Sequence, residues 1–504
     1  MKLLTREQSR NMDSFAIDTC KISGIDLMNS AGEKVAETVK YQIGDDTESK
    51  ILMLCGKGNN GGDGFAAATY LKEEGYNIEI HSLVEQDSIK TDSRYFFERC
   101  VALSCPISFG MEPDDLSDPD IIVDGILGTG FRKKLRPEIL PWIEWINERS
   151  AFVIAIDIPS GLDCDTGQIS PNAVIANKTI AMGYNKVGML LMNGKDHSGS
   201  IEPVDIGHPK KESFSHEDLQ WSLFNEKEIP NILKNIRTHT YKHKQGKVLI
   251  IAGSKGMTGA AVLATFGALR SGAGMTITCA PASLNSIYEK YILEGMTLSC
   301  SDEDRGYFTM NNLDQIIERS DWADSVIIGP GIGTNAETMA LAKALIESIN
   351  KPVILDADGL KCFRELQCDL EKLIVTPHLG EFSSMIDQTT NDIKSDFVAI
   401  VNRFMSGFNG TALIKHVPAC IFHGTQVSLN SSGNPALATA GTGDVLSGIL
   451  GTFRAQGMNG YDAARLGAYF HGEAGDQLSS SIGKRGMIAS DLPKAVASII
   501  KKYE

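Results

Sequence analysis

The sequence predicts an α/β protein of two successive domains, each with a parallel sheet that helices cover on both faces. Three observations support this prediction. The chain has 504 residues, which is more than one hydrophobic core usually serves. Short apolar runs without polar alternation, such as Ile51–Cys55 and Lys247–Ile251, are typical of strands buried on both faces. The alternation of such runs with helical segments begins a second time after residues 208–228, a charged stretch with little apolar periodicity.

The expected elements follow one another in two sets. In the first half we expect a helical segment at 9–41, strands at 51–55, 77–84, 121–124, 152–157 and 179–182, and a helix at 65–74. In the second half we expect strands at 247–251, 275–279, 325–328, 352–356, 372–375 and 412–415, then a strand pair at 420–422 and 426–429, and helices at 443–453, 462–478 and 490–501. We place the domains at residues 1–215 and 223–504.

Composition disfavours several classes of protein. The net charge of -15 disfavours binding to nucleic acid. No apolar run approaches the roughly 18 residues of a membrane helix, and residues 1–8 turn polar without the apolar region of a signal peptide. The ten cysteines form no Cys-x-x-Cys pair, so we expect reduced thiols rather than a zinc site or disulfides. We therefore expect a cytoplasmic protein with small-molecule ligands and with no nucleic-acid or membrane partner.

The most informative segment is Gly-Thr-Gly-Asp at 441–444, which lies directly before an apolar helix. Small residues there leave backbone N–H groups free at the positive end of the helix, and this suits a phosphate. Asp444 falls in the first helical turn. An anion there is unfavourable beside a phosphate unless it takes a proton from a substrate hydroxyl or holds Mg²⁺. The alternative is a structural role, because Asp is also a good N-terminal cap.

Five more motifs accompany this loop. Residues 253–261 and 329–333 (Gly-Pro-Gly-Ile-Gly) each follow an expected strand. Asp-Ala-Asp-Gly at 356–359, Thr-Pro-His-Leu-Gly-Glu at 376–381 and Lys415 follow later strands. Open α/β sheets bind ligands beyond the carboxyl ends of their strands. Six strand ends that carry Gly or ionisable residues therefore predict one shared crevice.

In this order, the six motifs resemble the ribokinase-like superfamily and, more narrowly, the NAD(P)H-hydrate dehydratase family, over about residues 223–504. The resemblance implies a ribokinase-like fold. It also implies phosphorylation of the C6 hydroxyl of hydrated NADH or NADPH, after which loss of phosphate restores the dihydronicotinamide. Asp444 is the implied catalytic base, and the implied hydrate-binding residues are Ala260 (or Ala261), Gly331, His378 and Asp444. The implied nucleotide-binding residues are Lys415, His416, Val417, Pro418, Ala419, Gly441, Thr442 and Gly443.

The segment after Lys415 departs from the family pattern. The family has Gly after the Lys and Thr at the fifth position, whereas this chain has His416 and Ala419. Glu381 is expected to hold Mg²⁺ indirectly, through water, as in related kinases. The fusion with a first domain implies ADP rather than ATP as the phosphoryl donor, with release of AMP and phosphate.

A second set of motifs lies in the first half. Residues 56–64 (Gly-Lys-Gly-Asn-Asn-Gly-Gly-Asp-Gly) link a strand to a helix without the Gly-Lys-Ser/Thr ending of a P-loop. Their glycines permit close approach to a diphosphate, and a tight structural turn is the alternative. Asp124 and Asp157 end two later strands and precede the loops 125–132 and 158–162. With Asn60, these carboxylates supply oxygen ligands for a cation and one spare base.

The motifs NNGGDG, DGILGTG and DIPSGLD resemble, in this order, the NAD(P)H-hydrate epimerase family over about residues 1–210. The resemblance implies a Rossmann-like, doubly wound domain that interconverts the R and S hydrates at C6. Asp157 is the implied catalytic acid/base, and Asn60, Asp124 and Ser160 are the implied ligands of K⁺. The implied hydrate-binding residues are Asn59, Asn60, Gly61, Gly62, Asp63, Gly128, Thr129, Gly130, Phe131, Arg132, Lys133, Lys134 and Asp157.

Together the two resemblances imply one repair unit for hydrated NADH and NADPH. A stereospecific dehydratase clears one epimer, and an epimerase on the same chain supplies it from the other. The expected ligands are both hydrates, ADP, Mg²⁺ and K⁺, and we expect a homo-oligomer. The alternative is a ribokinase-like kinase of a small alcohol, of the hydroxymethylpyrimidine or thiazole type, with a non-catalytic N-terminal binding domain. His378 and the loop 329–333 favour the dehydratase.

Overall fold

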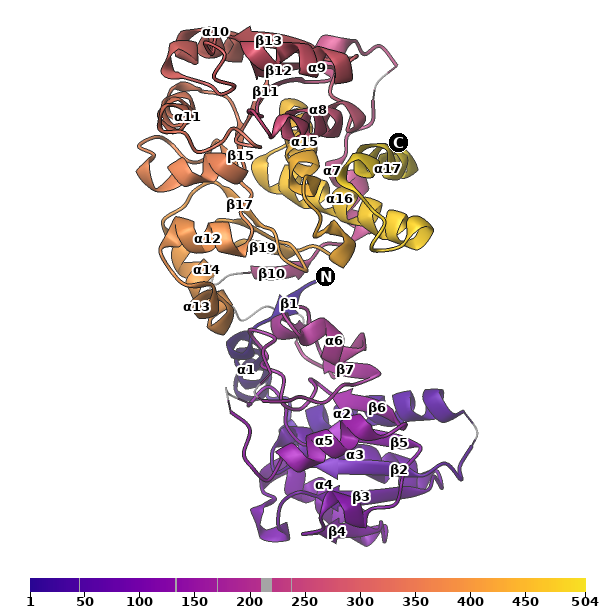
Figure 1. Ribbon diagram of the computed structural model, residues 1–504. Coiled ribbons are helices and arrows are strands. Elements are labelled where there is room, and N and C mark those ends of the chain that lie inside the picture. The colour runs from indigo at the N-terminus through magenta and orange to yellow at the C-terminus, as the bar shows by residue number, and fades with distance from the viewer. Residues whose placement is uncertain (45, 132–133, 170, 210–219, 237) are drawn as a thin grey trace. The chain divides into compact units, whose positions relative to one another are not determined.

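The computed structural model describes residues 1–44, 46–131, 134–169, 171–209, 220–236 and 238–504. The chain divides into two compact units (Figure 1). The N-terminal unit contains Lys2–Trp221 and Lys394–Val398, and the C-terminal unit contains Met1, Ser222–Ile393 and Ala399–Glu504. Within the described residues, no helix is long and apolar enough to cross a membrane.

The N-terminal unit is built on a seven-stranded sheet in the order β4-β3-β2-β5-β6-β7-β9. Every neighbouring pair of strands runs parallel. The strands are β2 (Ile51–Cys55), β3 (Ile78–Ser82), β4 (Ile107–Phe109), β5 (Ile121–Gly125), β6 (Phe152–Ile156), β7 (Lys178–Met182) and β9 (Ser200–Val204). The chain runs from β2 to one edge through β3 and β4, then returns to place β5 on the other side of β2. This reversal makes the carboxyl ends of β2 and β5 the expected ligand site of a doubly wound sheet.

Helices cover both faces of this sheet. They are α2 (Gly24–Ile43), α3 (Asn59–Glu73), α4 (Thr91–Ala102) and α5 (Leu140–Glu148). Ile51 and Met53 of β2 enter the core beneath α2, α3 and α4. Leu52 and Leu54, the intervening residues, enter a second core with Trp142 of α5. Because both faces of the strand are buried, its sequence is apolar without alternation.

Helix α3 begins at Asn59, inside the segment that the sequence suggested as a loop. Only residues 56–58 therefore connect β2 to the helix. The glycines make this possible by leaving no side chain at two crowded positions. A Cβ on Gly61 would stand 2.0 Å from the Gly56 carbonyl oxygen, and one on Gly62 would stand 2.4 Å from Ser93 Oγ.

One other expectation needs correction. The single helical segment expected at 9–41 is divided into α1 (Arg6–Ser14), a π-helical turn at Phe15–Thr19, and α2. The division occurs because Ser23 caps α2 by accepting a hydrogen bond from the Asp26 N–H at 3.2 Å. Of the junction expected at 208–228, residues 210–219 lie outside the described part of the chain.

The C-terminal unit has a ten-stranded sheet in the order β10-β19-β18-β17-β16-β15-β14-β11-β12-β13. The strands are β10 (Gln220–Leu223), β11 (Lys247–Ile251), β12 (Met275–Pro281), β13 (Met296–Cys300), β14 (Ser325–Ile328), β15 (Val353–Leu355), β16 (Leu373–Val375), β17 (Thr411–Ile414), β18 (Cys420–His423) and β19 (Gln426–Leu429). Strands β11 to β17 pair in parallel, whereas β18 and β19 extend the sheet antiparallel to their neighbours. The direction of winding reverses between β11 and β14, and this again marks a ligand site.

Figure 1 shows α8, α15, α16 and α17 on one side of the strands and a second group, with α10, α11, α12 and α14, on the other. The helices are α8 (Thr258–Arg270), α10 (Leu313–Trp322), α11 (Ala336–Ser348), α12 (Leu379–Ile386), α14 (Phe397–Ser406), α15 (Thr442–Ala455), α16 (Gly460–Ile482) and α17 (Leu492–Ile500). Helices α8 and α15 touch backbone to backbone. A Cβ on Gly448 would stand 2.1 Å from the Ala264 carbonyl oxygen, and one on Gly267 would stand 2.4 Å from that of Val445. This close contact fixes the start of α15 beside the start of α8.

Candidate active sites

The Gly-Thr-Gly-Asp segment forms the start of α15. Five rather than six of the C-terminal motifs therefore follow strands, and the sixth opens a helix. Gly441 has a φ of 89°, in the left-handed region that favours glycine. Thr442 donates its hydroxyl hydrogen bond to the carbonyl oxygens of Leu437 and Thr439, at 2.8 and 3.0 Å. The start of α15 has no side-chain cap, so Asp444 does not serve in that structural role.

Asp444 has an unusual proton affinity. Burial is the main cause that raises the pKa of Asp444 to about 7. The charge of Asp356 raises this pKa further, and the charge of Lys415 opposes the increase. A carboxylate that titrates near neutral pH is suited to take a proton from a substrate hydroxyl.

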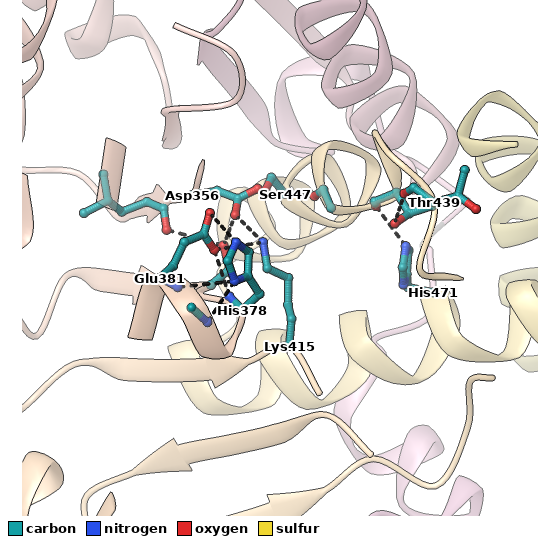
Figure 2. Close-up of polar contacts among 12 residues, drawn as sticks. Asp356, His378, Glu381, Lys415, Thr439, Ser447 and His471 are labelled. Carbon is teal, nitrogen blue, oxygen red and sulfur yellow. Dashed lines mark hydrogen bonds and ion pairs between the residues drawn. The ribbon is translucent and has the colours of Figure 1, made fainter. Parts of the chain in front are cut away.

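Asp356 lies below this loop, at the end of β15, and is 1% exposed. Lys415 Nζ lies 2.7 Å from its Oδ1, the Thr376 hydroxyl donates to the same oxygen at 2.7 Å, and Ser447 Oγ donates to Oδ2 at 2.6 Å. Figure 2 shows Asp356 between Lys415 and Ser447. Burial alone would raise the pKa of Asp356, but the charge of Lys415 and these hydrogen bonds hold it below the usual value. Asp356 is therefore ionised and fixes Lys415, whereas Asp444 is the carboxyl that titrates.

His378 and Glu381 form the start of α12. His378 Nδ1 accepts hydrogen bonds from the N–H groups of Gly380 and Glu381 at 3.0 and 3.2 Å, and Glu381 Oε2 accepts from the His378 N–H at 2.8 Å. Because Nδ1 accepts, the neutral ring carries its proton on Nε2. Glu381 Oε2 also lies 3.8 Å from Lys415 Nζ. The imidazole is thus held in a fixed orientation, with its Nε2 3.5 Å from Glu381 Oε1 (Figure 2).

Two cavities meet at the loop 441–444. The larger, of about 780 Å³, is lined by the four residues predicted to bind the hydrate, Ala260, Gly331, His378 and Asp444. Ala260 rather than Ala261 faces it, because Ala261 is fully buried in the core. Gly331, with φ of 59°, leaves room there, since a Cβ would stand 2.8 Å from that of Ala260.

The smaller cavity, of about 370 Å³, contains seven of the eight residues predicted to bind nucleotide. They are Lys415, His416, Val417, Pro418, Ala419, Thr442 and Gly443. The eighth, Gly441, lies on the larger cavity, and His378 borders both. The arrangement places Asp444 and the backbone of its loop between a hydrate-sized and a nucleotide-sized space.

The sequence interpretation missed His471, a residue in the middle of α16. His471 is buried, and its Nε2 donates to the Thr442 carbonyl oxygen at 2.9 Å. Burial lowers the pKa of His471 to about 4, so the ring is neutral and can donate only one proton. This hydrogen bond therefore stabilises the conformation of the loop 441–444 from the side of α16. A lone His in an apolar helix gives no sequence signal for this role.

In the N-terminal unit, Asn60, Asp124 and Ser160 come together at the ends of β2, β5 and β6. Asn60 Nδ2 donates to the carbonyl oxygens of Leu127 and Ile156 at 2.9 and 3.0 Å, so its Oδ1 points elsewhere. Asp124 is fully buried and accepts from the Ser160 N–H at 2.8 Å and from its hydroxyl at 2.6 Å. Burial raises the pKa of Asp124 to about 6, and no Lys or Arg of the described residues forms an ion pair with it. A buried carboxylate without a cationic side chain, beside Asn and Ser oxygens, fits a monovalent cation.

Asp157 follows β6 with φ of 64°, a left-handed conformation that is uncommon outside glycine. Its Oδ1 accepts from the Met182 N–H at 2.9 Å and forms an ion pair with Lys186, which is 2% exposed. Lys186 also donates to the Met182 carbonyl oxygen at 3.0 Å. Burial raises the pKa of Asp63, and the charge of Asp157 raises it further. The sequence interpretation missed Lys186, whose only signal is a lysine in a short apolar stretch.

A cavity of about 620 Å³ lies over these groups. Its lining includes Asn59, Asn60, Asp63, Gly128, Thr129, Gly130, Phe131, Lys134 and Asp157 from the predicted hydrate-binding set. Gly61 and Gly62 do not line it, because they pack inside α3. Arg132 and Lys133 lie outside the described residues.

Comparison with known proteins places both halves in families. Residues 24–188 match the family described as YjeF-related protein N-terminus, and residues 248–498 match the NAD(P)H-hydrate dehydratase family. The bifunctional NAD(P)H-hydrate repair enzyme Nnr of Moorella thermoacetica is 32% identical, over 100% of this chain and 97% of that protein. The protein of the same name from Methanothermobacter thermautotrophicus is 33% identical, over 94% of this chain and 91% of its own length.

The chain belongs to the family of bifunctional NAD(P)H-hydrate repair enzymes. Among solved structures, a ribokinase-like superfamily protein from Enterococcus faecalis resembles it with a TM-score of 0.50 and 23% identity, covering 58% of this chain and 99% of that one. The fold class and the family predicted from the sequence are thereby confirmed. The two sets of motifs therefore lie in the two halves that match these families.

Proposed function

We propose that this repair enzyme epimerises R- and S-NAD(P)H hydrate at the N-terminal site and dehydrates the S hydrate to NAD(P)H at the C-terminal site. The observation that supports the dehydratase reaction is Asp444, a carboxyl with a pKa of about 7. It lies on the larger cavity, in the loop 441–444 that suits a phosphate. In the dehydratase, Asp444 takes the proton of the C6 hydroxyl, whose oxygen then bonds to the terminal phosphorus of the donor. The proposed donor is ADP, so AMP leaves.

The phosphate ester makes elimination favourable. Hydroxide is a poor leaving group, whereas phosphate is a good one, so the C6–O bond breaks with the electrons leaving on the phosphate. Loss of a proton from C5 restores the ring double bond and gives NAD(P)H. The free N–H groups at the start of α15 suit the charge on the transferred phosphoryl group. His378, which lines the larger cavity, would donate its Nε2 proton to the hydrate.

Two cations belong to the proposal. Glu381, on the wall of the larger cavity, would hold Mg²⁺ through water, and this ion would neutralise charge on the phosphates. Asn60, Asp124 and Ser160 supply only oxygen ligands, which suits K⁺. In the epimerase, K⁺ would compensate the buried charge of Asp124 and hold the phosphate-facing loops in place.

Asp157 is the proposed acid/base of the epimerase. Its ion pair with Lys186 fixes one oxygen and leaves the other for the substrate. Asp63, whose pKa is raised by burial and by the charge of Asp157, provides a second carboxyl on the same cavity. We expect the enzyme to be cytoplasmic and homo-oligomeric.

The purified chain with ADP and Mg²⁺ should convert S-hydrate to NAD(P)H, measured as recovery of reduced-nicotinamide absorbance. Asp444→Ala should abolish this recovery and leave R/S interconversion intact, and Asp157→Ala should do the reverse. No recovery with either ADP or ATP would refute the dehydratase. Accumulation of a stable phosphate ester instead would favour a small-alcohol kinase, and joint loss of both activities in a folded Asp444→Ala variant would mean that the sites are not separable.

A further inference from the structure

One wall of the larger C-terminal cavity is a 3-10 helix, η9 (Ala357–Glu365). A 3-10 helix has three residues per turn, so residues three apart lie above one another on the same side. Asp358, Lys361 and Arg364 have this spacing, and all three line the cavity. They form a column of one carboxylate and two cations along the wall.

The column begins beside the catalytic carboxyl. Asp358 is close enough that its charge raises the pKa of Asp444. Each further turn of a 3-10 helix advances by about 6 Å. Lys361 therefore stands about one turn, and Arg364 about two turns, farther along the cavity from the end where Asp444 lies.

Lys361 and Arg364 are the only Lys or Arg side chains among the described residues that line this cavity. Their side chains are 58% and 56% exposed. Each has one acidic partner, Asp358 at 3.0 Å and Asp387 at 3.3 Å. Exposed ion pairs of this kind are weak. Both cations can therefore exchange these partners for a more highly charged ligand.

The hydrated dinucleotide needs such groups. Its reacting ring is joined through a ribose to a pyrophosphate with two negative charges, so a hydrate whose C6 hydroxyl reaches Asp444 must place that pyrophosphate farther along the same cavity. The remaining lining is mostly small or apolar, as at Met257, Leu263 and Leu360. An Arg fork binds phosphate oxygens in pairs, and a Lys binds them as a point charge.

We infer that Lys361 and Arg364 form the pyrophosphate-binding subsite of the dehydratase, with Lys361 on the phosphate nearer the reacting ring. The inference rests on the proposed dehydratase function and adds a residue pair that holds the substrate away from the reacting atoms. Such contacts bind the ground state and the transition state equally, so they set KM and not kcat.

Lys361→Gln and Arg364→Gln are the test variants, assayed with S-NADH hydrate and S-NADPH hydrate at saturating ADP and Mg²⁺. Each should raise KM by about tenfold, which corresponds to about 1.4 kcal/mol, with kcat unchanged. The factor should be the same for both hydrates because both carry the pyrophosphate. Arg403→Gln, an exposed cation on α14 away from the cavity, is the matched control and should leave KM unchanged.

Asp387→Asn separates binding from a structural role, because it breaks the Arg364 ion pair from the other side. Asn tolerates the left-handed conformation of Asp387 (φ of 58°). Its KM should not rise, whereas an increase equal to that of Arg364→Gln would show that the ion pair, not phosphate binding, matters. An unchanged KM in both test variants would overturn the subsite, and an increase for NADPH hydrate alone would overturn the pyrophosphate assignment. Activity of the unaltered enzyme tests the proposed function independently of these outcomes.

Discussion

Dehydration should be controlled by the ionisation of Asp444. The pKa of Asp444 is raised to about 7 because the carboxyl is buried near the negative charge of Asp356. The unprotonated form is the base, so activity should fall as the pH decreases below 7. At pH 6 about one tenth of the carboxyl is ionised and at pH 5 about one hundredth, so kcat/KM should fall about tenfold per pH unit.

Asp358→Asn should shift the acid limb of the pH–rate profile, the fall in activity below pH 7, in one direction. The charge of Asp358 is one of the causes that raise the pKa of Asp444, so its removal should shift the acid limb to lower pH. Asn keeps the oxygen that accepts a hydrogen bond from the Gly333 N–H at 3.1 Å, and the loop should stay in place. Asp444→Asn removes the base and should reduce the rate by about 100- to 10,000-fold at all pH values.

The assay is the initial rate of NAD(P)H formation from S-hydrate at low hydrate concentration and saturating ADP, from pH 5 to pH 9. Circular dichroism of the same samples reports whether the protein stays folded across this range. An acid limb near pH 4, or no limb, would show that Asp444 is not the titrating base. An acid limb near pH 7 that Asp358→Asn leaves in place would show that the charge of Asp358 does not raise the pKa of Asp444.

Four further outcomes are expected. Above pH 6 the N-terminal unit should unfold at a higher temperature in KCl than in tetramethylammonium chloride, because K⁺ offsets the buried charge of Asp124. At a K⁺ concentration 100 times its Kd, the stabilisation should be about 3 kcal/mol. Asp124→Asn should abolish this difference, and equal unfolding temperatures for the unaltered protein would contradict the K⁺ site. Lys186→Met should reduce epimerisation at least about 100-fold and leave dehydration unchanged, because Asp157 loses the cation that orients it; retained epimerisation would exclude Lys186 from the site. His471→Leu should leave the Thr442 carbonyl oxygen without its hydrogen-bond donor. Denaturant titration should then show a free energy of unfolding lower by about 1–2 kcal/mol, and steady-state rates should show a higher KM for ADP. An unchanged KM would confine His471 to a structural role. Finally, the folded pKa of Asp444 lies above its unfolded value of 3.8, so the folded state loses stability as the pH rises from about 4 to 7. Asp444→Asn should therefore increase the free energy of unfolding at pH 8 by up to about 4 kcal/mol, and a decrease would contradict the burial argument.

The strands and their order of motifs were accessible from the sequence because parallel strands are buried on both faces. An apolar run of five residues such as Ile51–Cys55 is too short for a typical helix but suits a strand that is buried on both faces. Residues that follow such strands must lie at one edge of the sheet. The positions of Asp124, Asp157 and Lys415 followed from this rule. The start of α3 at Asn59 did not follow, because glycines usually interrupt helices. Here they are required by close contacts with the Gly56 backbone and the Ser93 side chain that no local pattern reveals.

The sequence by itself thus determined which chemical groups gather at each sheet edge, since strand polarity is a local property. Only the tertiary structure decided their states and partners. Asp356 and Asp444 are both carboxyl groups of the same crevice, yet three polar contacts keep Asp356 ionised whereas burial raises the pKa of Asp444 to about 7. Lys186 and His471 became functional residues only through contacts with Asp157 and Thr442, which lie 29 residues away in the chain in each case. Proton affinity and orientation depend on what surrounds a group in space, and that is set by packing between distant segments.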